Sequence, residues 1–293
     1  MAVASHSSSA RVGAAFAVVA MGCVQIGLAV SVDLAQTLGA QGIVWLRLVF
    51  AALILLVVAR PWRATFTRRS LLTCVLLGVA TAGMTSFFMV AVTRIPLGTA
   101  SALEFLGPLG VAVARGKGPA RLWALVAAVG VLALTEPWLG TADPLGILFA
   151  LIAAVCWAGY IVLTQRAGDT VTGLQALAIS FPVAAIVVSF TITPALFTQL
   201  SWPILAAGLG LALLLPVVPF SLEFLALRRL EAAAYGTLMA LEPAIALLVG
   251  FVALGQVPRL LAVIGVGLVI VAGIGATRSG ARDAPEQDPP VAP

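Results

Sequence analysis

The chain is dominated by apolar segments of about 20 residues, the length that an α-helix needs to cross a lipid bilayer. Sixty-two per cent of its 293 residues are hydrophobic and only 9% are charged, whereas a soluble domain carries about 25% charged residues. Membrane-spanning β-strands would instead give alternating segments of about 10 residues. We therefore predict an all-α integral membrane protein. The predicted spans cover residues 12–32, 40–60, 70–92, 97–114, 119–137, 144–165, 171–193, 203–227, 232–253 and 256–277.

Two segments in different halves of the chain resemble each other at a constant offset of 135 residues. Segments 94–108 and 229–243 both begin with an arginine and an aliphatic residue and both end in a proline. Each half holds five predicted spans, so the second half must enter the bilayer in the opposite orientation. Inverted repeats are typical of secondary transporters, which bind the substrate between the halves. The predicted division is a disordered tail at 1–10, repeats at 11–138 and 142–277, and a disordered tail at 278–293.

The positions of the basic residues predict how the spans are oriented. If the N-terminus is cytoplasmic, 13 of the 16 Lys and Arg residues fall on the cytoplasmic side, as the positive-inside rule requires. Arg94 and Arg259 then fall in outer loops, and Arg47 lies within a span. We predict a multi-pass protein with both termini in the cytoplasm. The net charge of +5 is therefore an orientation signal and does not indicate a nucleic-acid partner.

Sequence signatures of enzymes and metal sites are missing. The chain has no GxxxxGK[ST] phosphate-binding loop, and its one histidine, His6, lies in the polar N-terminal tail. The three cysteines lie in apolar spans without metal-binding spacing and fit small packing residues. We expect no enzymatic activity, no cofactor and no metal. An intramembrane enzyme or a structural subunit is the alternative that these absences disfavour.

Ionisable residues within the predicted spans are the main candidates for function, because each costs about 2.5–3.5 kcal/mol at the centre of a bilayer. Glu104 lies roughly 10 Å into its span and Glu242 roughly 15 Å, at a rise of about 1.5 Å per residue. Such a carboxylate fits contact with a substrate amine or the uptake of a proton. The alternative is a neutral acid that hydrogen-bonds to a neighbouring helix.

Two further ionisable residues lie nearer the span ends. The guanidinium of Arg47 can bind a substrate carboxylate bidentately, but Arg47 could equally extend outward or form an ion pair with Glu104. Glu223 lies near the cytoplasmic end of its span and could pair with the arginines that follow it. Pro216 and Pro219 loosen the same helix, so this region is also a candidate inner gate.

Prolines next to the two deep carboxylates predict broken helices. Pro108 lacks the N–H that would bond to the carbonyl of Glu104, and Pro243 directly follows Glu242. A broken helix within the membrane is tolerated where it lines a cavity. Residues that either line such a cavity or pack between helices are Gln25, Trp157, Tyr160 and Tyr235.

Four glycines in the last span allow helices to approach closely. They favour packing within the chain, with a homodimer as the alternative. These glycines are Gly265, Gly267, Gly273 and Gly275.

Several segments resemble EamA-type members of the drug/metabolite transporter superfamily, and within it the threonine and homoserine exporters. The most specific are PLGTASALEFLGPLGVAV at 96–113 and SLEFLALRRL followed by YGTLMALEPA within 221–244. CWAGYIVLTQRAG at 156–168 and VQIG at 24–27 agree with them. The resemblance covers residues 11–277. The residues that match the family pattern are Glu104, Glu223, Glu242 and Gln25.

The resemblance implies ten helices in two EamA repeats, a place in the bacterial inner membrane, and proton-coupled export of small neutral amino acids. The expected partners are the lipid bilayer, a small-molecule substrate and protons. Efflux of drugs or other metabolites by the same fold is the alternative. Two departures from the family are Gln256, where an acidic residue is usual, and a short loop that ends at Pro119.

Overall fold

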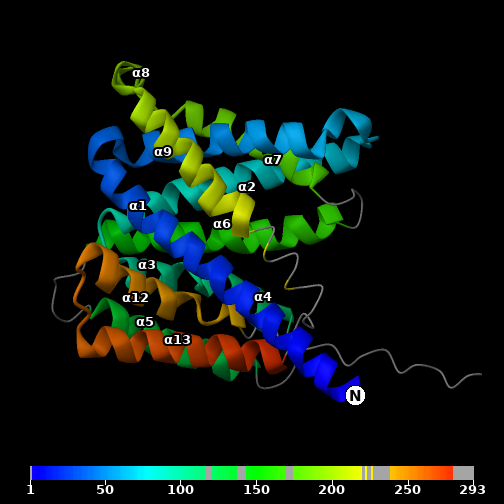
Figure 1. Ribbon diagram of the computed structural model, residues 1–293. Coiled ribbons are helices and arrows are strands. Elements are labelled where there is room, and N and C mark those ends of the chain that lie inside the picture. The colour runs from blue at the N-terminus through cyan, green and yellow to red at the C-terminus, as the bar shows by residue number, and fades with distance from the viewer. Residues whose placement is uncertain are drawn as a thin grey trace, which may run out of the picture.

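A computed structural model gives the arrangement of the chain as a bundle of helices that run roughly side by side (Figure 1). It describes residues 2–115, 120–136, 143–168, 174–219, 222, 226 and 238–279. Within this part of the chain, three helices are long and apolar enough to cross a membrane: Arg11–Arg63, Arg68–Val92 and Pro144–Thr164. Shorter apolar helices of 10–17 residues accompany them. The predicted all-α architecture is confirmed, whereas the number of spans and the inversion of the repeats remain predictions.

The helices follow the predicted spans closely, with breaks that the apolar runs did not reveal. They are α1 (Ala2–Ala59), η1 (Pro61–Arg63), α2 (Arg68–Val92), α3 (Leu97–Glu104), α4 (Leu106–Arg115), α5 (Ala120–Thr135), α6 (Pro144–Gly168), α7 (Gln175–Ser189), α8 (Ala195–Gln199), α9 (Trp202–Ala212), the π-helical turn η3 (Leu213–Val217), α12 (Glu242–Leu254) and α13 (Leu260–Ser279). Residues 137–142, which contain the predicted boundary between the repeats, lie outside the described residues.

The first two predicted spans form one long helix with a sharp break. Gly39 has φ 72° and ψ 158°, a conformation that glycine adopts without steric cost. The two arms of α1 therefore point in different directions (dark and lighter blue in Figure 1). The helix also begins at Ala2 and so extends through the predicted disordered tail at 1–10. Extending a helix adds one hydrogen bond for each residue that is fixed, which favours this continuation.

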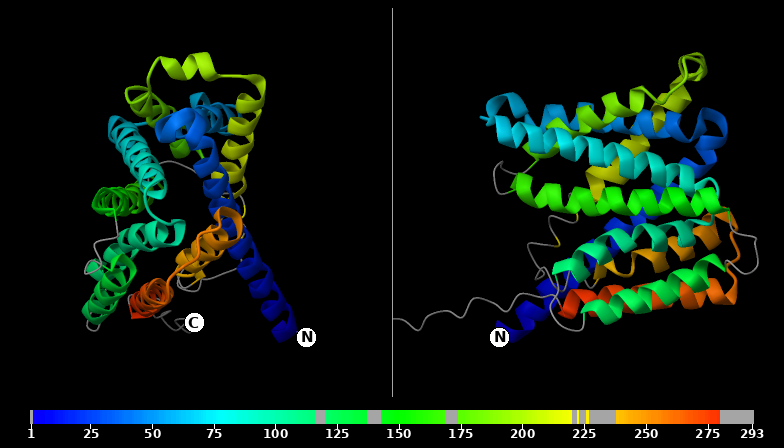
Figure 2. Two further views of the ribbon diagram at one scale, coloured as in Figure 1. Left: turned by 90° about the vertical axis from the view of Figure 1, so that its left-hand side faces the viewer. Right: turned by 180° about the vertical axis from the view of Figure 1, so that it is seen from behind.

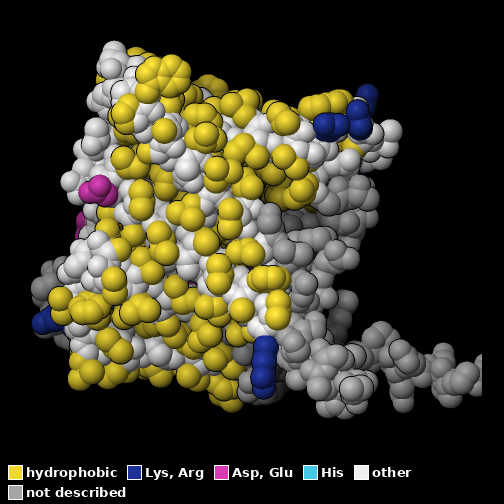
Figure 3. All heavy atoms as spheres, viewed as in Figure 1, with side chains coloured by type: hydrophobic (Ala, Val, Ile, Leu, Met, Phe, Trp, Pro, Cys, Tyr) yellow, Lys and Arg dark blue, Asp and Glu magenta, His cyan; other side chains and the backbone are white. Residues whose placement is uncertain are grey.

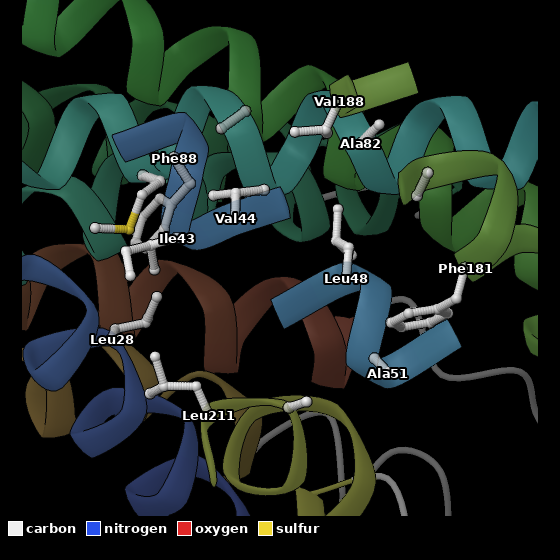
Figure 4. Packing of buried hydrophobic residues seen from close by; sticks show 14 of the residues in the cluster. Leu28, Ile43, Val44, Leu48, Ala51, Ala82, Phe88, Phe181, Val188 and Leu211 are labelled. Atoms are coloured by element: carbon white, nitrogen blue, oxygen red, sulfur yellow. The ribbon is translucent and has the colours of Figure 1, made fainter. Parts of the chain in front are cut away.

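The core lies where both arms of α1 meet α2, α7 and α9. Figure 4 shows Ile43, Val44 and Leu48 of the second arm against Phe88 of α2 and Val188 of α7. On the other side of the bundle, α5 packs along α13, and α3 packs against α12 and α6. Figure 2 shows both groups of helices end-on and from behind. Hydrophobic side chains cover the middle of the face in Figure 3, with charged side chains near its edges.

Three of the four glycines of the last span are used for packing within the chain, whereas a Cβ on Gly267 would meet nothing within 4 Å. A Cβ on Gly265 would lie 2.7 Å from the carbonyl oxygen of Gly130, so α5 and α13 approach closely. Gly273 lies against the ring of Phe105, and Gly275 lies against Trp123. These contacts favour the packing interpretation. A homodimer is not tested by them and stays a prediction.

The junction of α4 with α6 provides a stability test close to the helix break. A Cβ on Gly107 would clash with the backbone carbonyl of Ala154, whereas Gly110, on the same helix, has nothing within 4 Å. We expect Gly107→Ala to lower the free energy of unfolding by about 1–3 kcal/mol, because backbone atoms must move apart. Gly110→Ala is the matched control, and it should leave stability unchanged or raise it slightly. Thermal unfolding of the two variants in detergent measures the difference. Equal midpoints would contradict the close α4–α6 contact.

Candidate substrate site

A cavity of about 600 Å³ lies at the centre of the bundle. Its walls come from both arms of α1 and from α2, α3, α4, α6, α7, η3, α12 and α13. The lining is mostly apolar, and the charged side chains that the structure describes in it are Arg47, Glu104 and Glu242. Concave apolar sites with a few placed polar groups are typical of small-molecule binding. Segments from both halves of the chain therefore contribute to a single site.

Glu104 lies at the break between two short helices. It is the last residue of α3, Phe105 forms a turn, and α4 begins at Leu106. Pro108 has no N–H to donate to the Glu104 carbonyl, so the main-chain oxygen and the side-chain carboxylate of this residue lie together at the break. Pro108 also lines the cavity. The break thus presents two acceptor groups from one residue.

Glu242 is held by a hydrogen bond from the first arm of α1. Gln25 Nε2 donates to Glu242 Oε1 at 3.2 Å, across 217 residues of sequence. The Gln25 side chain is 1% exposed, and its Oε1 has no hydrogen-bond partner among the described residues. Gln25 is not part of the cavity wall but contacts the site through Glu242. Glu242 is the first residue of α12, and the buried Pro243 follows it in the first turn.

Arg47 lies in the second arm of α1 and is only 6% exposed. It does not extend outward to the surface but lines the cavity. Its charge interacts with that of Glu104, and the charge of Glu104 interacts with that of Glu242. Within the described part of the chain, however, Arg47 forms no ion pair or hydrogen bond with Glu104. The cavity therefore holds one cationic and two acidic side chains, of which Arg47 and Glu104 are not paired with each other in the described part of the chain.

The other predicted site residues fall into two groups. Trp157 and Tyr160 of α6 line the cavity, as do Pro216 in the π-helical turn η3 and Pro219 just beyond it. A π-turn is a local departure from the α-helix that is frequent at functional sites. The two remaining predicted residues lie outside the described residues: Glu223 and Tyr235.

One face of α2 was missed by the sequence reasoning. Thr81, Met84, Thr85 and Phe88 all line the cavity. Their spacing of i, i+3, i+4 and i+7 places them on the same side of a helix. The two threonines four residues apart in a mostly apolar span were the available signal. Sequence alone could not show that this face turns inward, because threonine also bonds readily to its own helix.

The end of the bundle that carries the α2–α3 and α12–α13 connections, here called the α2–α3 end, is tightly closed. The Leu97 N–H at the start of α3 donates to Gln256 Oε1 at 2.9 Å. A Cβ on Gly98 would lie 2.8 Å from the Leu247 Cα, so α3 and α12 approach closely. Gln256 stands where an acidic residue is usual in the resembled family. Its amide makes the contact instead.

Two ion pairs at the α2–α3 end hold the residues that flank segment 137–142. Arg94 pairs with Asp143 at 3.0 Å, and Arg259 pairs with Glu136 at 2.9 Å. The hydrogen bond from Arg94 lowers the pKa of the Asp143 carboxyl. Arg94 and Arg259, the two arginines predicted to lie in outer loops, therefore both have acidic partners.

Comparison with known proteins identifies the class to which this fold and cavity belong. Residues 144–277 match the EamA-like transporter family. The chain is 36% identical over 265 residues to the threonine/homoserine exporter RhtA of Escherichia coli (strain K12), covering 88% of this chain and 89% of the relative. A crystal structure with 17% sequence identity aligns over 92% of this chain and 95% of its own with a TM-score of 0.58, which supports the fold alone.

The chain therefore belongs to the EamA-like transporter family. The threonine/homoserine exporter RhtA of Salmonella typhimurium (strain SL1344) is similarly related, at 35% identity over 90% of this chain and 91% of its own. The family and these relatives confirm the prediction of a transporter rather than an enzyme. They also indicate a multi-pass protein of the bacterial inner membrane.

Proposed function

We propose that this protein exports small neutral amino acids of the threonine and homoserine type from the cytoplasm in exchange for protons. The observation that carries the proposal is the cavity, which brings Arg47, Glu104 and Glu242 together in an otherwise mostly apolar wall. The named relatives are threonine/homoserine exporters, which supports the same cargo here.

An amino acid is a zwitterion, and the charges of the cavity match both of its ends. The planar guanidinium of Arg47 suits a carboxylate, which it can bind through two parallel hydrogen bonds. The carboxylate of Glu104 and the carbonyl freed by Pro108 suit an ammonium group. Since Arg47 forms no ion pair with Glu104 among the described residues, both groups are available to a substrate.

The two acidic residues provide a means of proton coupling. Two negative charges in one low-dielectric cavity repel each other, and a single proton or a single ammonium relieves the repulsion. Gln25 already donates to Glu242, and this bond stabilises the negative charge there. Glu104 receives no hydrogen bond from the described residues, so it is the carboxylate that we assign to the exchange of proton for substrate.

The proposed transport cycle alternates between two openings of the same cavity. Ten spans in two inverted halves, with both termini in the cytoplasm, would place the α2–α3 end outside. Lining residues such as Tyr160, Pro216 and Gly273 lie toward the opposite end of their helices. The closed α2–α3 end therefore fits an inward-facing state. Pro216 and Pro219 are the proposed inner gate, with Glu223 as a further part of it.

Uptake into inside-out membrane vesicles tests the proposal. With an acidic lumen, vesicles that contain the protein should accumulate threonine and homoserine, and collapse of the pH gradient should abolish the accumulation. Vesicles from cells without the protein are the control. Failure of the verified, folded protein to move either amino acid would refute the proposed cargo. A competition panel of hydrophobic cations would then test the alternative of drug efflux, which Arg47 disfavours because it places a positive charge in the cavity.

A further inference from the structure

The proposed binding of a zwitterion by Arg47 and Glu104 gives no role to two hydroxyl groups of the cavity. Thr81 and Thr85 lie one helical turn apart on the α2 face that lines the cavity. Thr81 is 2% exposed, and Thr85 is half-buried. Near them on this face, Met84 and Phe88 are apolar. The wall that α2 contributes is thus apolar with two hydroxyls set into it.

Both hydroxyl groups already donate their hydrogen atom to a main-chain carbonyl of α2. Thr81 Oγ1 donates to the Leu77 carbonyl at 2.8 Å, and Thr85 Oγ1 donates to the Thr81 carbonyl at 2.8 Å. A hydroxyl carries one donor and two acceptor lone pairs. Toward the cavity, each threonine is therefore an acceptor. An acceptor in this position favours a ligand group that can donate, and it disfavours a methyl group of the same size.

We infer that Thr81 and Thr85 accept a hydrogen bond from the side-chain hydroxyl of the substrate and so select hydroxylated amino acids over their aliphatic isosteres. This inference rests on the proposed function and adds the basis of its selectivity. Arg47 and Glu104 bind the charged groups common to every amino acid, so they cannot distinguish one side chain from another. Met84 and Phe88, the apolar residues beside the threonines, contact the short carbon chain. Thr85, the more exposed of the two, makes the principal contact.

Competition between isosteres in inside-out vesicles tests this selectivity. Valine replaces the hydroxyl of threonine by a methyl group, and norvaline does the same for homoserine. Wild-type protein should prefer the hydroxylated member of each pair. Thr85→Val should reduce that preference by about 2- to 10-fold, the effect of losing one hydrogen bond, while uptake of valine itself persists and shows that the variant is folded. Thr81→Val should act in the same direction.

Two controls keep the result specific. Thr85→Ser retains the hydroxyl and should retain the preference. Thr73→Val removes a hydroxyl that also bonds to its own helix, at 3.0 Å to the Arg69 carbonyl, but it lies outside the cavity and should change nothing. Unchanged preference in both Thr81→Val and Thr85→Val, or no preference in the wild type, would overturn the inference while threonine export stands. Absence of threonine uptake by the wild type would instead refute the proposed function.

Discussion

Glu104→Gln is expected to abolish accumulation of threonine driven by a pH gradient and to leave only weak exchange of threonine across the membrane, because an amide oxygen attracts the substrate ammonium less than a carboxylate does. Glutamine keeps the size of the side chain and one acceptor oxygen, but it carries no charge and cannot take up or release a proton. Without that proton, the gradient no longer drives the cycle, so the internal concentration should only equilibrate with the outside. The measurement compares gradient-driven accumulation with counterflow of labelled threonine in the same vesicles.

The matched control for this result is Glu136→Gln. Glu136 is also a buried acidic residue, 7% exposed, but it pairs with Arg259 and does not line the cavity. Its amide variant should keep full gradient-driven accumulation. Undiminished accumulation by Glu104→Gln would contradict the assignment of Glu104, and the corresponding Glu242→Gln variant would then be the next to measure.

Arg47→Met should reduce amino-acid transport by about 100-fold or more, without loss of stability. A bidentate contact with the substrate carboxylate comprises two charge-assisted hydrogen bonds of about 1.5–3 kcal/mol each. Removing a buried cation that has no ion pair in the described structure also removes a desolvation cost. We therefore expect the midpoint of thermal unfolding to stay the same or rise while transport falls. Transport and unfolding are measured on the same preparation.

Two further variants separate charge from shape at this position. Arg47→Lys keeps the positive charge but loses the planar fork, so it should retain part of the transport activity. Arg69→Met removes an exposed arginine outside the cavity and should leave transport intact. A large drop in unfolding midpoint for Arg47→Met would show a structural role for this arginine instead. Normal transport by that variant would exclude it from substrate binding.

The sequence singled out those residues of the candidate site that are energetically costly in a membrane. Arg47, Glu104 and Glu242 are expensive in an apolar span, and the structure places all three around one cavity. Thr81 and Thr85 carried no such signal, because a threonine can satisfy its own hydroxyl within the helix. Which face of α2 turns inward depends on packing against α6 and α7, and a single sequence does not contain that information.

The sequence predicted a helix end where a residue prevents a main-chain hydrogen bond. It did not predict one where a residue merely allows additional backbone conformations. Pro108 forbids one main-chain hydrogen bond, and the chain breaks one turn before it, between α3 and α4. Gly39 permits several conformations, so the two spans predicted at 12–32 and 40–60 could not show that helix continues on both sides up to a break at this one residue. The contact between Leu97 and Gln256 joins residues 159 positions apart. Such a distant contact becomes visible only once the chain is folded.

That contact has a consequence for how the outer side of an alternating transporter would open. Leu97 is fully buried, and Gln256 is the acceptor for its N–H. Separating α3 from α12 would leave this N–H without a hydrogen-bond acceptor in an apolar environment, at a cost of about 1–3 kcal/mol. Only water could replace the lost acceptor there. Outward opening and the entry of water as far as Leu97 would therefore be one event, and the hydration of a single amide would report which way the transporter faces.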